Sequence, residues 1–233
     1  MRAWRSNPAA ARWWHIATVL VIAASLGVQL VLVIQGTNVL VEDGEEAPGA
    51  AMRVVNFFSF FTVQSNILLA AGSAVLAKDP GFDGGRLWRV VRLAGLIGIS
   101  VTGVVYVTLL RGLVDLEGAA AVTNVGFHYL SPLLGAIGWA LFGPWPRFDR
   151  RVLLVSLAWP VAWLAYTLVR GEIVDWYPYP FIDVGELGYA RTLVNSAGVT
   201  VLLLGVGWLF LTGDRRLGDR AGTQPADELP DRR

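Results

Sequence analysis

Six stretches of the chain contain no Asp, Glu, Lys or Arg and are long enough, as helices, to cross a lipid bilayer. They cover residues 13–35, 54–77, 93–110, 119–142, 152–169 and 192–211. A hydrocarbon core of about 30 Å needs roughly 20 apolar residues in an α-helix. Only 16% of the 233 residues are charged, whereas a soluble domain carries about 25%. We therefore predict an all-α integral membrane protein with six transmembrane helices, forming a single domain over residues 1–212.

The basic residues predict which side each connection occupies. If six helices alternate in direction, 15 of the 19 Lys and Arg residues lie together, in the N-terminus, residues 78–92, residues 147–151 and the C-terminal tail. The opposite connections are acidic. Because cytoplasmic loops are enriched in Lys and Arg, we expect both termini to be cytoplasmic in a multi-pass protein of the cell membrane. Residues 213–233 are polar and poor in hydrophobic residues, so we predict a disordered cytoplasmic tail.

The second hydrophobic stretch begins with an aromatic run, NFFSFFTVQSN, that also carries hydrogen-bonding side chains. At 100° per residue, Ser59, Thr62 and Asn66 share one helix face, Ser65 lies at its margin and Gln64 on the far side. Thr62 is expected about 12 Å below the outer boundary. A threonine in a membrane helix most often donates to the carbonyl four residues back, and the other polar groups can serve as interhelical contacts.

The fourth stretch has a matching polar face in TNVGFHYLSPLLG, formed by Asn124, His128, Ser131 and Gly135. His128 is expected about 10 Å deep, nearly level with Thr62. An ionisable residue at that depth marks a functional site by default, although a neutral histidine bonded to a Tyr or Asn is a structural alternative. If the second and fourth helices are neighbours, the two side chains can meet.

Other polar residues lie near the outer ends of the remaining helices and predict a pocket that faces the outer leaflet: Tyr106, Tyr166, Thr167 and Asn195. A hydroxyl beside an imidazole is the minimal nucleophile–base pair for acyl transfer. Its usual third member is a carboxylate, for which Asp183 is a candidate if its loop folds inward, and Asn124 is another. Candidate oxyanion donors are Ser65, Asn66, Asn195 and a tyrosine. With no cysteine and no buried carboxylate, we predict no metal site and no cofactor.

Three segments resemble the androgen-induced-gene and androgen-dependent TFPI-regulating protein family of six-pass membrane proteins, in particular its bacterial Pr-six-Pr branch. They are FFTVQSNILLA, NVGFHYLSPLLG and the WP…Y…RGEIVDWYPYPFIDV run. The resemblance covers about residues 13–211. Animal members hydrolyse fatty acid esters of hydroxy fatty acids with a membrane-embedded threonine and histidine, and these match Thr62 and His128.

The resemblance therefore implies a threonine hydrolase of long-chain lipid esters, in which Thr62 attacks the ester and His128 accepts its proton. The expected partners are the lipid ester and membrane lipids, with no nucleic acid, and the oligomeric state stays open. The alternative is a non-catalytic membrane protein that binds or transports a lipid-like molecule in the outer pocket. A proton- or ion-coupled transporter would normally bury carboxylates near the midplane, and none of the six stretches contains one.

Overall fold

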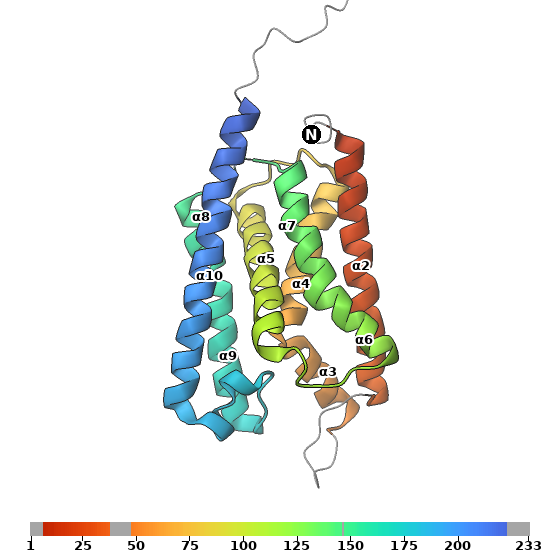
Figure 1. Cartoon of the computed structure of the whole chain (residues 1–233), viewed down its shortest axis with the longest axis vertical. Coiled ribbons are helices and arrows are strands. Elements are labelled where there is room, and N and C mark those ends of the chain that lie inside the picture. The colour runs from red at the N-terminus through yellow and green to blue at the C-terminus, as the bar shows by residue number, and fades with distance from the viewer. Residues whose placement is uncertain (1–6, 38–47, 146, 223–233) are drawn as a thin grey trace, which may run out of the picture.

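The computed structural model describes residues 7–37, 48–145 and 147–222, and within these ranges every regular element is a helix (Figure 1). The elements, in chain order, are α2 (Pro8–Gln35), α3 (Ala50–Ser59), α4 (Phe61–Lys78), α5 (Arg86–Val105), the π-helical turn η1 (Tyr106–Leu110), α6 (Gly118–Val125), the π-helical turn η2 (Gly126–Leu130), α7 (Ser131–Phe142), α8 (Arg150–Ser156), α9 (Ala158–Val174), the 3-10 turn η3 (Pro180–Ile182) and α10 (Val184–Gly222). The predicted all-α class is confirmed.

Five helical units in the described ranges are long and apolar enough to cross a membrane: Pro8–Gln35, Arg86–Leu110, Gly118–Phe142, Arg150–Val174 and Val184–Ala221. Each contains one of the predicted hydrophobic stretches. The remaining stretch, 54–77, is not one straight helix as predicted. It is divided into α3 and α4, whose axes are bent by 66°, and this pair brings the number of possible spans to six.

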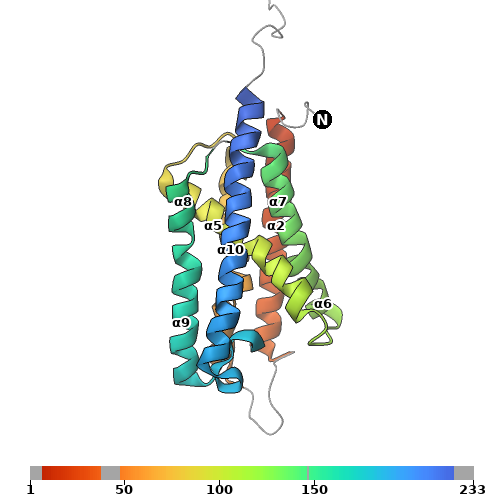
Figure 2. The same ribbon diagram turned by 60° about the vertical axis from the view of Figure 1, so that its left-hand side comes forward.

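The centre of the bundle is formed by α4 and α5, which pack against each other (Figure 1). On one side, α2 packs against α4, α6 and α7. On the other side, α8 and α10 pack against α5, and Figure 2 shows α9 and α10 side by side. A Cβ added at Gly95 of α5 would lie 2.8 Å from the backbone of Leu69 in α4, so glycine is what lets these two helices approach so closely. The functional side chains are carried by this core pair and its neighbours.

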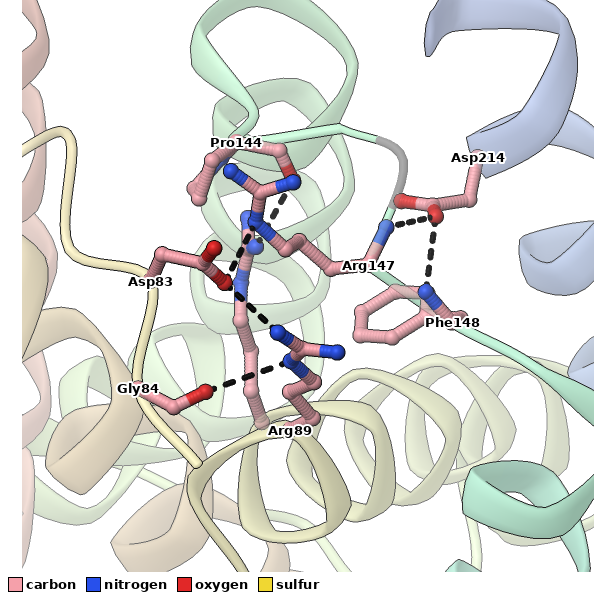
Figure 3. A network of polar contacts seen from close by, with 8 residues as sticks. Asp83, Gly84, Arg89, Pro144, Arg147, Phe148 and Asp214 are labelled. Atoms are coloured by element: carbon pink, nitrogen blue, oxygen red, sulfur yellow. Dashed lines mark hydrogen bonds and ion pairs between the residues drawn. The ribbon is translucent and has the colours of Figure 1, made fainter. Parts of the chain in front are cut away.

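A polar network ties the connections together at one end of the bundle (Figure 3). The Asp83 carboxylate pairs with Arg89 at 2.7 Å and with Arg147 at 2.9 Å. The Asp214 carboxylate, on α10, is fully buried and accepts from the backbone N–H groups of Arg147 and Phe148. Arg92 of α5 donates to the carbonyls of the 143–144 connection. The α4–α5 connection, the α7–α8 connection and the end of α10 are thereby joined.

This network corrects the predicted start of the C-terminal tail. The sequence predicted a disordered segment from residue 213, but α10 continues to Gly222. Because Asp214 is held by backbone donors from the α7–α8 connection, the helix extends past the end of the apolar stretch. The rest of the predicted tail, residues 223–233, lies outside the described residues.

The start of α2 and the end of α10 lie at the same end of the bundle, which is also the end with the polar network (Figure 1). The connections that follow η1 and α9 lie at the opposite end. The candidate site lies toward this opposite end of the bundle, because Thr62 is at the start of α4 and Tyr179 lies just before η3.

Candidate functional site

The break between α3 and α4 places Thr62 in the first turn of a helix. Phe60 has an extended backbone (φ −65°, ψ 131°), and α4 begins at the next residue with no side chain capping its N-terminus. The backbone N–H groups of a first helical turn have no partner within the helix. Thr62 supplies one of them, and this N–H donates to the Tyr179 hydroxyl at 3.1 Å.

The carbonyl groups released by the break accept hydrogen bonds from side chains of α4 and α9. The Gln64 amide donates to the Phe58 carbonyl at 3.0 Å, and the Trp163 indole donates to the Ser59 carbonyl at 2.9 Å. Trp159 in turn donates to the Gln64 side-chain oxygen at 3.0 Å. Gln64, which lay off the predicted polar face, therefore stabilises the break that presents Thr62.

The Thr62 hydroxyl lies between two other polar groups. Its Oγ1 is 3.4 Å from Nε2 of His128 and 3.1 Å from the Tyr179 hydroxyl. Because the Tyr179 oxygen already accepts the Thr62 backbone N–H, all groups are satisfied when Tyr179 donates to Oγ1 and Oγ1 donates to Nε2. The second and fourth predicted helices are thus neighbours, and Thr62 and His128 meet as the sequence suggested.

His128 lies in the π-helical turn η2, and the sequence accounts for that turn. Pro132 has no N–H to donate to the His128 carbonyl, and its ring disfavours a regular α-turn there. The chain instead forms a wider turn, in which Ser131 Oγ donates to the Gly126 carbonyl at 2.9 Å. A Cβ at Gly126 would lie 2.0 Å from Ser25 Oγ of α2, so glycine permits the close packing of η2 against α2. Single π-turns occur frequently at functional sites.

The other ring nitrogen fixes the tautomer of His128. Nδ1 lies 3.1 Å from the backbone carbonyl oxygen of Asn124, and a carbonyl can only accept. Nδ1 therefore carries the proton of the neutral ring, and Nε2 presents its lone pair to Thr62, which is the form that a general base requires. The ring also stacks on Tyr106, with centroids 4.1 Å apart and planes 20° from parallel, and the Asn124 side chain donates to the Tyr106 hydroxyl at 2.6 Å.

An apolar cavity of about 300 Å³ adjoins Thr62 on the side of α5, α9 and α10. Thr62 and Tyr179 both line it, and most of the remaining wall is aliphatic or aromatic, with Val101, Leu157, Leu203 and Phe181 among the lining residues. Thr102 also lines it, and within the described residues its buried hydroxyl has no hydrogen-bond partner. The nucleophile candidate is therefore reached from a space that suits a hydrocarbon chain.

The remaining predicted site residues have other contacts. Asn66 donates to the backbone carbonyl of Thr62 at 2.9 Å, so it supports the first turn of α4. The Tyr166 hydroxyl bonds to Ser59 at 2.8 Å. Asn195 donates to the Phe181 carbonyl at 2.8 Å and thereby holds the loop before α10.

Two further predicted positions differ from their expected roles. The buried Ser65 hydroxyl has no partner among the described residues, and it faces Gly98 of α5. Asp183 was a candidate for orienting His128, but its carboxylate accepts from the Glu186 N–H at the start of α10. His128 is held instead by the backbone carbonyl of Asn124, because Asn124 lies four residues earlier in the same span.

Tyr179 is a site residue that the sequence analysis did not single out, because the connection after α9 contains several aromatic residues and the sequence does not distinguish among them. It lies in the connection between α9 and α10, where it is buried between Phe60 and Phe181. Burial raises its pKa to about 12. The phenol therefore stays protonated near neutral pH and can donate a hydrogen bond at the site.

Metal ligation is not suggested by the side chains, since the described residues contain no group of three or more His, Cys, Asp or Glu that could hold an ion. Comparison of the chain with protein-family models, with curated proteins and with solved structures gives no match. What the site can do chemically therefore follows from its own geometry: an oriented imidazole, a hydroxyl within its reach and an apolar cavity beside them.

Proposed function

We propose that the chain is a six-pass protein of the cell membrane, with both termini in the cytoplasm, and that it hydrolyses lipid esters with Thr62 as nucleophile. The shared location of the start of α2 and the end of α10 supports an even number of crossings, with the bent α3–α4 pair as one of them. The basic connections at that end support its cytoplasmic orientation. The site then lies in the outer half of the membrane.

The observation that carries the hydrolase proposal is the contact between Thr62 Oγ1 and His128 Nε2, with Nδ1 of the same ring bonded to a carbonyl. A nucleophile beside a base that a third group orients is the arrangement used in covalent acyl transfer. Its separation of 3.4 Å is long for a hydrogen bond, as catalytic contacts often are before substrate binds. The same two residues carry the resemblance to the androgen-induced-gene family, and we propose membership of that family on this ground.

In the proposed reaction, Thr62 Oγ1 attacks the ester carbonyl carbon and its proton passes to His128 Nε2. The Tyr179 hydroxyl donates a hydrogen bond to the oxyanion, because it lies within reach of Oγ1 and lines the same cavity. Nε2–H then protonates the leaving alcohol, which leaves an acyl-Thr62 ester. His128 next takes a proton from water as the resulting hydroxide attacks the acyl carbon. Nε2–H then returns this proton to Thr62 Oγ1, and the fatty acid and the Thr62 hydroxyl are released.

Among the residues that the structure describes, no carboxylate contacts His128, and the aromatic face of Tyr106 takes part of the role that a triad carboxylate has. The imidazolium formed during attack lies against this ring, which attracts positive charge. The Asn124 side chain holds the Tyr106 hydroxyl and so fixes the ring that supports the base.

The test is hydrolysis of a long-chain p-nitrophenyl ester by the purified protein, together with labelling by a fluorophosphonate lipid. Thr62→Val should abolish both hydrolysis and the adduct, and peptide mass spectrometry should place the adduct on Thr62. His128→Gln should lower the rate about 10²- to 10⁴-fold, which is the usual contribution of a general base.

The matched control is Thr108→Val, because Thr108 is a threonine in the same half of the bundle whose hydroxyl donates to its own helix. This variant should keep full activity and labelling. Hydrolysis near the wild-type rate in both Thr62→Val and His128→Gln would refute the mechanism. A protein that binds lipid but shows no turnover and no adduct across a panel of esters would instead support the non-catalytic alternative, which the apolar cavity also favours.

A further inference from the structure

The cavity beside Thr62 extends to the outer surface of the bundle between α9 and α10. These two helices contact each other only sparsely, and residues from both line the cavity. Val161 of α9 is 65% exposed and Leu204 of α10 is 48% exposed, yet both belong to the cavity wall. The cavity therefore has a mouth between α9 and α10, with Val161 and Leu204 at its rim.

The surface around this mouth is apolar. Leu154 and Val169, to either side of Val161 along the chain, and Val201 and Leu209, near Leu204, are all exposed. In a membrane-spanning bundle, such a surface faces lipid tails rather than water, because large exposed apolar areas are otherwise avoided. A mouth in this surface opens among lipid tails and admits a hydrocarbon chain.

The buried part of the cavity wall contains the candidate nucleophile. Thr62 and Tyr179 line it there, while Thr200 and Ser196 donate their hydroxyl groups to their own helix. A volume of about 300 Å³ is at the lower end of the range for small-molecule sites. It suits one acyl chain better than two.

We propose that the cavity is the binding site for a single acyl chain, which enters sideways from the hydrocarbon core of the membrane between α9 and α10. This inference rests on the proposed function for the position of the ester, which would lie at Thr62 and Tyr179 with its acyl tail extending toward Val161 and Leu204. The substrate class is then an ester that presents one straight chain within the outer leaflet. The cavity holds the acyl chain, so the site selects mainly for that part of the substrate.

The test measures binding in the catalytically silent Thr62→Val background, so that turnover does not enter. The probe is tritiated 1-O-hexadecylglycerol, a single-chain ether lipid that cannot be hydrolysed, and its binding to immobilised protein is measured at equilibrium in detergent micelles. Val161→Trp and Leu204→Trp fill the mouth, and each should weaken binding at least about tenfold, a loss of about 1.4 kcal/mol.

The matched controls are Val169→Trp and Leu209→Trp, on the same two helices. Their wild-type side chains are 64% and 68% exposed, and neither lines the cavity. Both controls should bind the probe within about twofold of the parent. Equal binding by all four tryptophan variants would overturn the proposal, as would a parent protein that does not bind the probe.

A second measurement separates this inference from the proposed function. If tryptophan at the mouth blocks probe binding but the wild-type protein hydrolyses no ester, the acyl-chain site stands and the hydrolase proposal fails. If the wild type hydrolyses esters and Val161→Trp has an unchanged KM for every chain length, the hydrolase stands and entry between α9 and α10 is refuted. The expected result for Val161→Trp is a KM that increases with chain length relative to wild type.

Discussion

Replacing Tyr179 by Phe removes one oxygen atom from the centre of the site and leaves the ring. The ring contacts with Phe60 and Phe181, at centroid distances of 5.5 and 5.4 Å, do not involve the hydroxyl. What is lost is the acceptor for the Thr62 backbone N–H and the hydrogen bond to Thr62 Oγ1, both at 3.1 Å. The substitution therefore tests the hydrogen bonds at Thr62 with little change in packing.

Two magnitudes follow from these contacts. The Thr62 N–H becomes a buried donor without an acceptor, which costs about 1–3 kcal/mol of folding stability. A hydrogen bond to a charged oxyanion contributes about 1.5–3 kcal/mol. Since each 1.36 kcal/mol of activation free energy changes the rate tenfold, kcat should fall about 10- to 100-fold. KM should change little, because the cavity wall keeps its shape.

The assay is steady-state hydrolysis of a long-chain p-nitrophenyl ester, with thermal unfolding of the same preparations in detergent. Tyr189→Phe is the matched control, because the Tyr189 hydroxyl donates to Glu172 and the side chain is 50% exposed. It should keep wild-type activity. A kcat for Tyr179→Phe within twofold of wild type would refute the assigned hydrogen bonds. A loss as complete as that of Thr62→Val would refute the role of Tyr179 as a donor and assign the chemistry to Tyr179 itself.

Three further outcomes are expected. Asp214→Ala should lower the free energy of unfolding by about 3–5 kcal/mol. It removes the acceptor of two backbone N–H groups and a negative charge that acts on buried Arg92. A loss below about 1 kcal/mol in denaturant unfolding would contradict this. Thr102→Val should raise the unfolding midpoint, since it replaces a buried hydroxyl that has no partner among the described residues and removes a cost of about 1–3 kcal/mol; a lowered midpoint would mean that the hydroxyl is bonded. The pKa of Tyr179 is raised to about 12, against about 10 for a free tyrosine. As pH rises, the unfolded state therefore loses the Tyr179 proton before the folded state does. The free energy of unfolding should fall by up to about 3 kcal/mol between about pH 10 and about pH 12. Tyr179→Phe should lack this part of the decline in alkaline unfolding curves, and an unchanged pH profile would contradict the burial of the hydroxyl.

The positions of the hydrophobic stretches could be predicted from the sequence, because they depend on local pattern. The meeting of Thr62 with His128 was predicted only on the condition that the second and fourth helices are neighbours, which local pattern does not determine. The depth estimate for Thr62 assumed a straight helix over 54–77, which is wrong, and most of the residues counted from Val54 to Thr62 belong to α3, on the other side of the break. The contact with His128 depends instead on the packing of η2 against α4.

The break itself could not be predicted, because residues 54–62 contain no Pro or Gly. It arises from tertiary packing of two consecutive phenylalanines in different directions. Phe60 contacts Trp176 and Tyr179 edge to face, whereas Phe61 stacks on Trp159. All these partners come from α9 and the connection after it. Gln64, placed off the polar face, was the one local signal, since an amide within an apolar stretch needs polar groups to bond.

The role of Tyr179 likewise could not be predicted from the sequence. In an aromatic loop, composition shows that the rings are amphipathic but not which hydroxyl points inward. The π-turn at His128 did have a signal, because Ser131–Pro132 interrupts the regular bonding of that span.

The π-turn at Gly126–Leu130 also constrains how this chain can change over evolution. A π-turn holds one more residue than the α-turn it replaces, so deleting one residue within it would restore an α-turn and keep Asn124 and the segment before it in phase with α7. Gly126, which packs against Ser25, and Gly135, which packs against Leu69, could then still face their partners. An alignment with a relative whose span is a regular α-helix should therefore need a one-residue gap within this turn.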